Sequence, residues 1–134
     1  MPDDGLITLQ SKHDFATTLS RLVAALEERN VTIFAKIDHA AGAASVDRKL
    51  RPTTLVIFGN PAAGTALMQE KQTSGIDLPL KALVWEDADG SIRLTYNDPG
   101  WISARHSLGH NADLAVVGIT AVLSALARHA TNGS

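Results

Sequence analysis

The chain has 134 residues, a formal net charge of -2 and no cysteine, and 4% of its residues are aromatic. The length fits one domain, and the lack of cysteine excludes disulfides, thiolate catalysis and cysteine-ligated zinc or iron–sulfur centres. The small charge and scarce aromatics argue against a nucleic-acid or membrane partner. The acidic start, MPDDGLITLQ, is unlike a signal peptide, so we expect a cytoplasmic protein with one domain over residues 4–130.

Apolar periodicity divides the chain into strand-like and helix-like segments. In chain order we expect a strand over 5–10, a helix over 11–30, strands over 31–38 and 51–59, a helix over 61–71, strands over 80–87 and 91–97, and a helix over 112–130. Short helices are expected within 39–50 and 98–111. The order β-α-β-β-α-β-β-α predicts an α+β two-layer sandwich, with a mainly antiparallel sheet of about five strands and the helices on one side.

Local signals set the boundaries of these elements. Ser11 is the expected N-cap of the first helix, with Asp14 as its capping-box acid, and Asn30 can end that helix in a left-handed conformation. The apolar run of the strand over 51–59 predicts that both of its faces are covered. An Asp-Gly turn supports the hairpin between the last two strands.

The helix over 112–130 is apolar around most of its circumference. It is shorter than the roughly 20 apolar residues that a membrane span needs, and Asp113 and Arg128 bound it. Two interpretations remain: the helix packs centrally on the sheet, or its outer face is also buried against a second copy of the chain.

The segment GNPAAGT, residues 59–65, lies between a strand and a helix, where phosphate-binding loops occur. It lacks the lysine and the following hydroxyl residue of a nucleotide-hydrolysing loop, and Pro61 begins the helix early. Asn60 is then either the N-cap of its own helix or, with the free backbone N–H groups behind it, a contact for an anion.

Two other stretches carry polar residues that suit chemistry. KIDHA places Lys36, Asp38 and His39 at a strand end, where Asp38 and His39 form either an acid–base pair or an ordinary solvated pair. His106 and His110 have the i, i+4 spacing of metal ligands. Gly109 interrupts that helix and no glutamate follows His106, so we expect no metal.

The ordering of TIFAKIDHAAGA, RPTTLVIFGNPAAGTALMQ and GIDLPLKALVWEDADGSIRLTYNDPGWISARHSLG resembles the family called domain of unknown function 302, over roughly residues 5–110. The resemblance implies a compact α+β domain in small cytoplasmic, often dimeric proteins, with no established activity. The motif positions of the family map to Lys36, Asp38, His39, Gly59, Asn60, Pro61, Leu78, Pro79, Lys81, Tyr96 and His106.

Three hypotheses on function follow. The leading one is a binding domain that holds a small anionic ligand where Asn60 meets Lys36, His39 and Lys81, with no cofactor. The second is an enzyme that uses His39 as a general base, oriented by Asp38 or assisted by His106. The third is an interaction module that forms a homodimer through its last helix. The candidate ligand-binding residues are Lys36, Asp38, His39, Asn60, Lys81, Tyr96 and His106.

Overall fold

The computed structural model describes residues 4–132. The strands are β1 (Leu6–Gln10), β2 (Thr32–Asp38), β3 (Thr53–Gly59), β4 (Leu80–Glu86) and β5 (Ile92–Asn97). The helices are α1 (Phe15–Glu28), α2 (His39–Ala44), α3 (Pro61–Glu70), α4 (Pro99–Arg105) and α5 (Asp113–Asn132), with 3-10 turns η1 (Gln72–Asp77) and η2 (His110–Ala112). The strands form one five-stranded sheet in the order β1-β5-β4-β3-β2, and every neighbouring pair is antiparallel.

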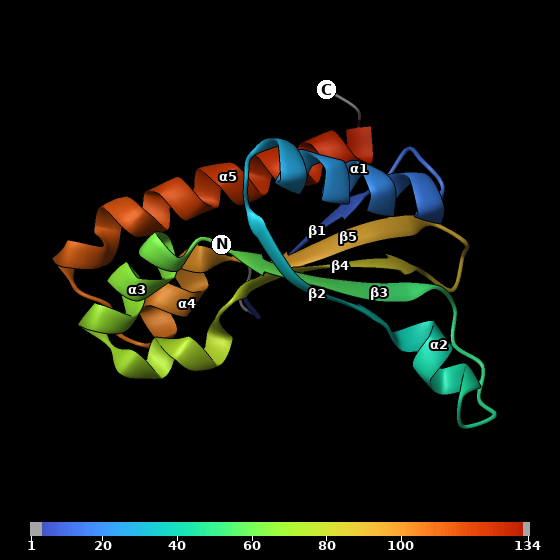
Figure 1. Cartoon of the computed structure of the whole chain (residues 1–134), viewed down its shortest axis with the longest axis horizontal. Helices are drawn as coiled ribbons and strands as arrows, with labels where there is room; N and C mark the ends of the chain where they lie inside the picture. Colours follow the sequence, from blue (N-terminus) through green and yellow to red (C-terminus); the bar gives the residue numbers. More distant parts are fainter. Residues whose placement is uncertain (1–3, 133–134) are drawn as a thin grey trace.

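One face of this sheet is covered by α1 and α5, which run across it side by side (Figure 1). Alternate strand residues point into this layer, so Val56, Phe58, Val84 and Leu94 are almost completely buried. Leu26 of α1 and buried leucines of α5 pack against these strand residues and complete the core. The expected two-layer α+β sandwich is therefore confirmed. The shorter helices lie at the ends of the sheet, with α3 and α4 at one end and α2 at the other.

Most expected element boundaries agree with the structure, but the start of α1 does not. Ser11 was the expected N-cap; instead Asp14 caps the helix, and its carboxylate accepts a hydrogen bond from Thr17 N at 2.7 Å. Ser11 shares a hydrogen bond with the hydroxyl of Thr18. At the other end, Asn30 has φ 56 and ends the helix as expected.

The second face of the sheet is not crossed by any helix within residues 4–132, so the prediction that β3 is covered on both faces was wrong. A row of three apolar residues lies on this face: Ile37, Leu55 and Leu83. Leu55 is the register partner of the other two, so all three share one face. Its neighbours Thr54 and Val56 are buried under the helices, so Leu55 points to the opposite side. We call this surface the open sheet face and define it by its apolar residues: Phe34, Ile37, Leu55, Ile57, Leu83 and Trp85.

Phe34 belongs to this face despite the irregular register of β2. Its ring lies 3.3 Å from the position that a Cβ on Gly59 would take, and Gly59 alternates with the inward-pointing Phe58. Phe34 is 52% exposed and Ile37 is 40% exposed. A monomer therefore exposes apolar side chains on the central and edge strands of its sheet.

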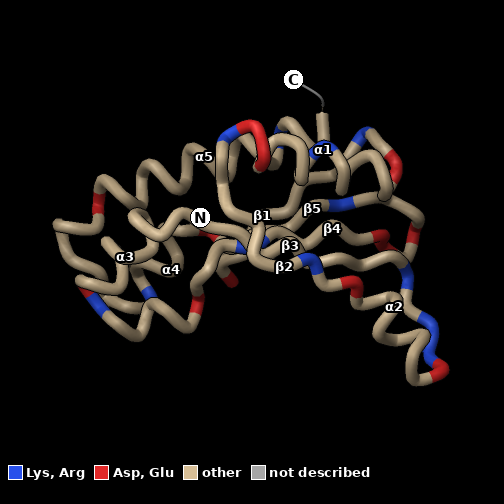
Figure 2. Tube along the Cα trace, viewed as in Figure 1, with Lys and Arg blue, Asp and Glu red and all other residues tan. Residues whose placement is uncertain are grey.

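The helical segment from His110 to Asn132 is long and apolar enough to cross a membrane by length and composition. The sequence argument that this segment is too short for a membrane span was therefore wrong. Its sheet-facing residues, including Ile119, Leu123 and Leu126, are buried in the core. Its outer face remains exposed at Leu114 and Val117, and no charged residue occurs between Asp113 and Arg128 (Figure 2).

Candidate functional site

The residues of the expected anion site lie at opposite ends of the sheet. Asp38 ends β2 beside Thr54, whereas Gly59, which precedes Asn60, pairs with Thr32 at the other end of β2. His39 begins α2 and is exposed to solvent. The expected meeting of Asn60 with His39 therefore does not occur, because consecutive antiparallel strands place these positions a full strand length apart.

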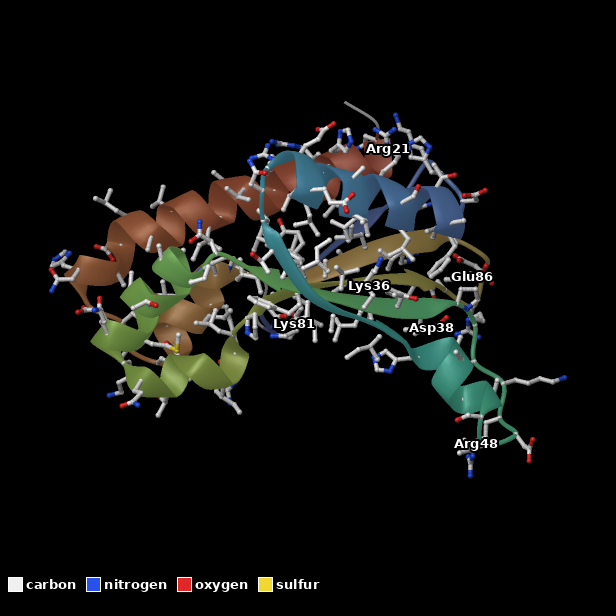
Figure 3. All side chains as sticks on the ribbon, in the orientation of Figure 1. Arg21, Lys36, Asp38, Arg48, Lys81 and Glu86 are labelled. Carbon is white, nitrogen blue, oxygen red and sulfur yellow. The ribbon has the colours of Figure 1, made fainter. Side chains whose placement is uncertain are left out.

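The two lysines of that expected site also lie apart. Lys36 is the register partner of inward-pointing Val56, whereas Lys81 is the partner of Ile57 on the open sheet face. Figure 3 shows Lys81 toward the α3 and α4 end of the sheet, Asp38 toward the α2 end, and Lys36 between them. The two lysines are therefore separated mainly by the sheet itself, because they lie on its opposite faces. The four groups expected to favour a negative charge are thus not one site.

Two of the candidate residues cap their own helices. The side chain of Asn60 accepts a hydrogen bond from Ala62 N at 2.9 Å, as an N-cap does. The carboxylate of Asp38 does the same for α2, accepting from Ala41 N at 2.9 Å. Asp38 is therefore engaged by backbone in this structure, and it makes no described hydrogen bond to the ring of His39 within residues 4–132. The proposed Asp38–His39 acid–base pair does not form.

Tyr96 lies in the core, where 6% of its surface is exposed. Burial raises the pKa of its hydroxyl above the ordinary value, and nearby Asp98 adds to this effect. The hydroxyl is therefore neutral at physiological pH, and the ring packs on the helix-covered face of the sheet.

His106 and Lys81, in contrast, converge on Asp77 at the end of η1. The Nε2 atom of His106 lies 2.6 Å from Asp77 Oδ2, and its Nδ1 lies 3.1 Å from the hydroxyl of Thr73. Arg105 donates from one nitrogen to both oxygens of the same carboxylate, at 3.0 and 3.1 Å. We call Thr73, Asp77, Lys81, Arg105 and His106 the Asp77 cluster. Its geometry joins an imidazole to a carboxylate and a hydroxyl.

Burial within the Asp77 cluster is uneven. The side chains of His106 and Asp77 are 7% and 13% exposed, whereas that of Arg105 is 50% exposed. Arg105 also lies over the ring of Trp101, 5.7 Å from its centroid. Lys81 donates to the backbone oxygen of Asp77 at 3.2 Å. Burial lowers the pKa of Lys81, and the charge of Asp77 opposes this effect.

The other side chains that suit ligands do not add to this site. His110 shares a 2.9 Å contact with Asp113, and within residues 4–132 it has no described hydrogen bond to His106. Within residues 4–132, no three His, Asp or Glu side chains gather as a metal site requires. Two surface grooves, one of about 690 Å³ at the start of α1 and one of about 200 Å³ between α1 and α5, contain none of the seven candidate residues.

Sequence reasoning missed Thr73, Asp77 and Arg105. Thr73 and Asp77 fall in a stretch expected to be a loop, which the structure forms as the 3-10 turn η1. Such turns are short and have no apolar periodicity that marks which side chains share a face. The one usable signal was the position of Asp77 directly before the Leu78-Pro79 dipeptide in the DLPLK stretch quoted for the resemblance.

Comparison with known proteins shows the same fold and sequence family. The fold is similar to that in the crystal structure of an uncharacterized conserved protein, DUF302, from Bacillus stearothermophilus, with a TM-score of 0.82 and 15% identity over 94% of this chain and 98% of that chain. Residues 7–126 match the model of the family described as Domain of unknown function DUF302.

Curated relatives from Brucella are similar in sequence over most of this chain. The protein named Fluoride-specific ion channel FluC 1 of Brucella suis biovar 1 (strain 1330) is 48% identical over 114 residues, which are 85% of this chain and 45% of that protein. Its namesake in Brucella abortus biovar 1 (strain 9-941) is also 48% identical, with 42% of its length covered. The chain therefore spans less than half the length of these relatives. With its family model matched over most of its length, the chain belongs to the DUF302 family.

Proposed function

We propose that this domain is an interaction module that forms a homodimer through its open sheet face. The observation that carries the proposal is the apolar character of that face on the central strands, where no helix covers it within residues 4–132. Contiguous apolar surface rimmed by polar residues is typical of protein interfaces. Here the rim is formed by polar residues of β5 and β1, including Thr95 and Thr8, whose hydroxyls share a 2.8 Å hydrogen bond.

A second copy is the occupant we favour, because the same chain carries a segment suited to cover this face. Residues 39–52, which we call the arm, contain α2 and the loop that follows it. None of the residues of α2 is buried, and Val46 and Leu50 of the arm are 63% and 48% exposed. Figure 1 shows α2 beyond the end of the sheet, on the side away from α1 and α5. The arm thus extends away from its own core and toward the side that a second copy would occupy.

In a dimer with twofold symmetry, the same patch on each copy meets its counterpart. The open sheet face and the arm of a single chain therefore supply both halves of the interface. Each arm can then bury Val46 and Leu50 against the other copy. The Brucella relatives are consistent with a modular role, since the matched region is less than half of each of those proteins.

Phe34→Glu tests the interface, with Val117→Glu as its matched control. Both residues are apolar and well exposed, at 52% and 65%, but Phe34 lies on the open sheet face and Val117 on the outer face of α5. A buried carboxylate without a partner opposes association strongly. We expect Phe34→Glu to sediment as a monomer at concentrations where the wild type and Val117→Glu sediment as dimers.

The control also decides between the two surfaces that dimerisation can use. If Val117→Glu dissociates the protein and Phe34→Glu does not, the interface is the outer face of α5 and the open sheet face is not involved. If neither substitution changes the sedimentation of an associated wild type, both surfaces are excluded. Circular dichroism of each variant confirms that the fold is intact.

The second candidate function is the binding of a small anion, now at the Asp77 cluster. The observation that favours it is the presence of two cations around Asp77. Arg105 binds its carboxylate and Lys81 its backbone oxygen, and half of the Arg105 side chain is open to solvent. A guanidinium suits phosphate and carboxylate groups because it presents several donors in one plane.

Arg105→Gln tests this candidate, with Lys71→Gln as a control at another exposed cation. We expect millimolar inorganic phosphate or acetate to raise the melting temperature of the wild type and of Lys71→Gln, and to leave that of Arg105→Gln unchanged. A wild type that responds to neither anion contradicts anion binding at this cluster.

A further inference from the structure

The Asp77 cluster contains a hydroxyl, an imidazole and a carboxylate in a continuous hydrogen-bonded line. Thr73 Oγ1 and Asp77 Oδ2 contact opposite nitrogens of the His106 ring, at 3.1 and 2.6 Å. Nucleophilic catalysis requires an exposed nucleophile with a more buried base and carboxylate behind it, and the three groups differ in exposure in that order. Thr73 is exposed to solvent, whereas the side chains of His106 and Asp77 are 7% and 13% exposed. A hydroxyl that can reach a substrate is thus backed by a shielded base.

We propose that Thr73 is an acyl-accepting nucleophile whose substrate class is a small carboxylic ester. With the proton of His106 on Nε2, that N–H donates to Asp77 and the free Nδ1 accepts from the Thr73 hydroxyl. The pairing with Asp77 favours this tautomer, since a carboxylate can only accept. The nitrogen roles are reversed relative to the usual serine hydrolase arrangement, but each nitrogen has the partner that its role requires.

The reaction balances without a further reagent. Thr73 Oγ1 adds to the ester carbonyl while its proton passes to Nδ1 of His106. The carbon–oxygen bond to the alcohol then breaks, the alcohol leaves with that proton, and an acyl-threonine remains. Water, activated by the same nitrogen, hydrolyses the acyl-threonine to the carboxylic acid and restores the hydroxyl.

Neighbouring contacts hold this line in place. Arg105 binds both oxygens of Asp77, which fixes the carboxylate plane, and Lys81 holds the backbone oxygen of the same residue. The adjacent hydroxyl, Ser74, is unsuited to the role because it is completely buried. The chain also supplies a control, since Thr65 on α3 is exposed and has no described histidine contact within residues 4–132.

The test treats the full chain with p-nitrophenyl acetate, follows release of p-nitrophenolate and locates the acetyl group by peptide mass. We expect a burst of product and acetyl on Thr73 in the wild type, in Thr73→Ser and in Thr65→Val. Thr73→Val is expected to lose both signals. His106→Gln is expected to slow the burst by about 100-fold or more, which is the usual contribution of a general base.

A wild type without acetyl on Thr73 overturns the proposal, as does a burst of equal size in Thr73→Val. Because the wild-type peptide map decides the first point directly, the test does not depend on the stability of a variant. The proposal needs neither the dimer nor an anion at Arg105, so it stands or fails separately from both. If it fails, the line of hydrogen bonds serves to tie η1 to the end of α4.

Discussion

Replacing His106 with alanine is expected to lower the free energy of unfolding by about 2–4 kcal/mol, because the change removes two hydrogen bonds and leaves a cavity. The imidazole is 7% exposed and joins η1 to α4 through Asp77 and Thr73. Without the ring, one oxygen of the part-buried Asp77 carboxylate loses its shortest contact. Urea denaturation followed by circular dichroism measures the change.

His110→Ala is the matched control for this prediction. His110 also lies 2.9 Å from an aspartate, Asp113, but its side chain is 100% exposed. Exposed ion pairs contribute little because water solvates the separated partners well. We therefore expect no measurable change for His110→Ala. Equal effects of the two substitutions would contradict the claim that the Asp77 cluster stabilises the fold because it is buried.

Phe58→Ala is expected to cost about 3–5 kcal/mol, the range for a large aromatic side chain removed from a packed core. Phe58 is 1% exposed and points from β3 into the layer under α1 and α5. The ring fills space between the sheet and the helices that backbone shifts cannot close completely. The cost is the difference between the two unfolding free energies in urea.

Phe34→Ala provides the comparison on the opposite side of the sheet. Phe34 is 52% exposed, so its truncation is expected to cost the isolated monomer less than about 1 kcal/mol. The measurement is made at the lowest usable protein concentration, where association contributes least. The same substitution is expected to weaken the dimer. A large loss of monomer stability would mean that Phe34 packs against its own chain and is not part of a free surface.

The pattern of elements was predictable because it depends on local signals. Asn30 ended α1 as its left-handed tendency predicts, and Gly90 has φ 84 in the turn between β4 and β5. The N-cap of α1 was misplaced by three residues, since Ser11 and Asp14 are both good caps and the sequence does not say which one the following residues select.

The expected anion site is incompatible with the strand order that the sequence itself predicts. If β2 and β3 are consecutive antiparallel strands, His39 after the end of β2 and Asn60 after the end of β3 must lie at opposite ends of the sheet. The contact between Asp77 and His106 is different. The two residues come from a 3-10 turn and a helix end, and no periodicity predicts that their side chains meet.

The open sheet face is the place where the apolar pattern of the sequence and the structure of the single chain disagree. The apolar run of β3 predicts cover on both faces, and one of the two covers is missing from residues 4–132. Leu55 and Ile57 are apolar although no helix lies over them. In the dimer that we propose, a second copy supplies the missing layer and thereby accounts for the apolar run.

Sedimentation equilibrium of the wild-type chain tests this central claim most directly, over protein concentrations from about 1 μM to about 300 μM. The account predicts a mass that rises toward twice the 14.2 kDa of one chain. A mass that remains at 14.2 kDa over the whole range would contradict it.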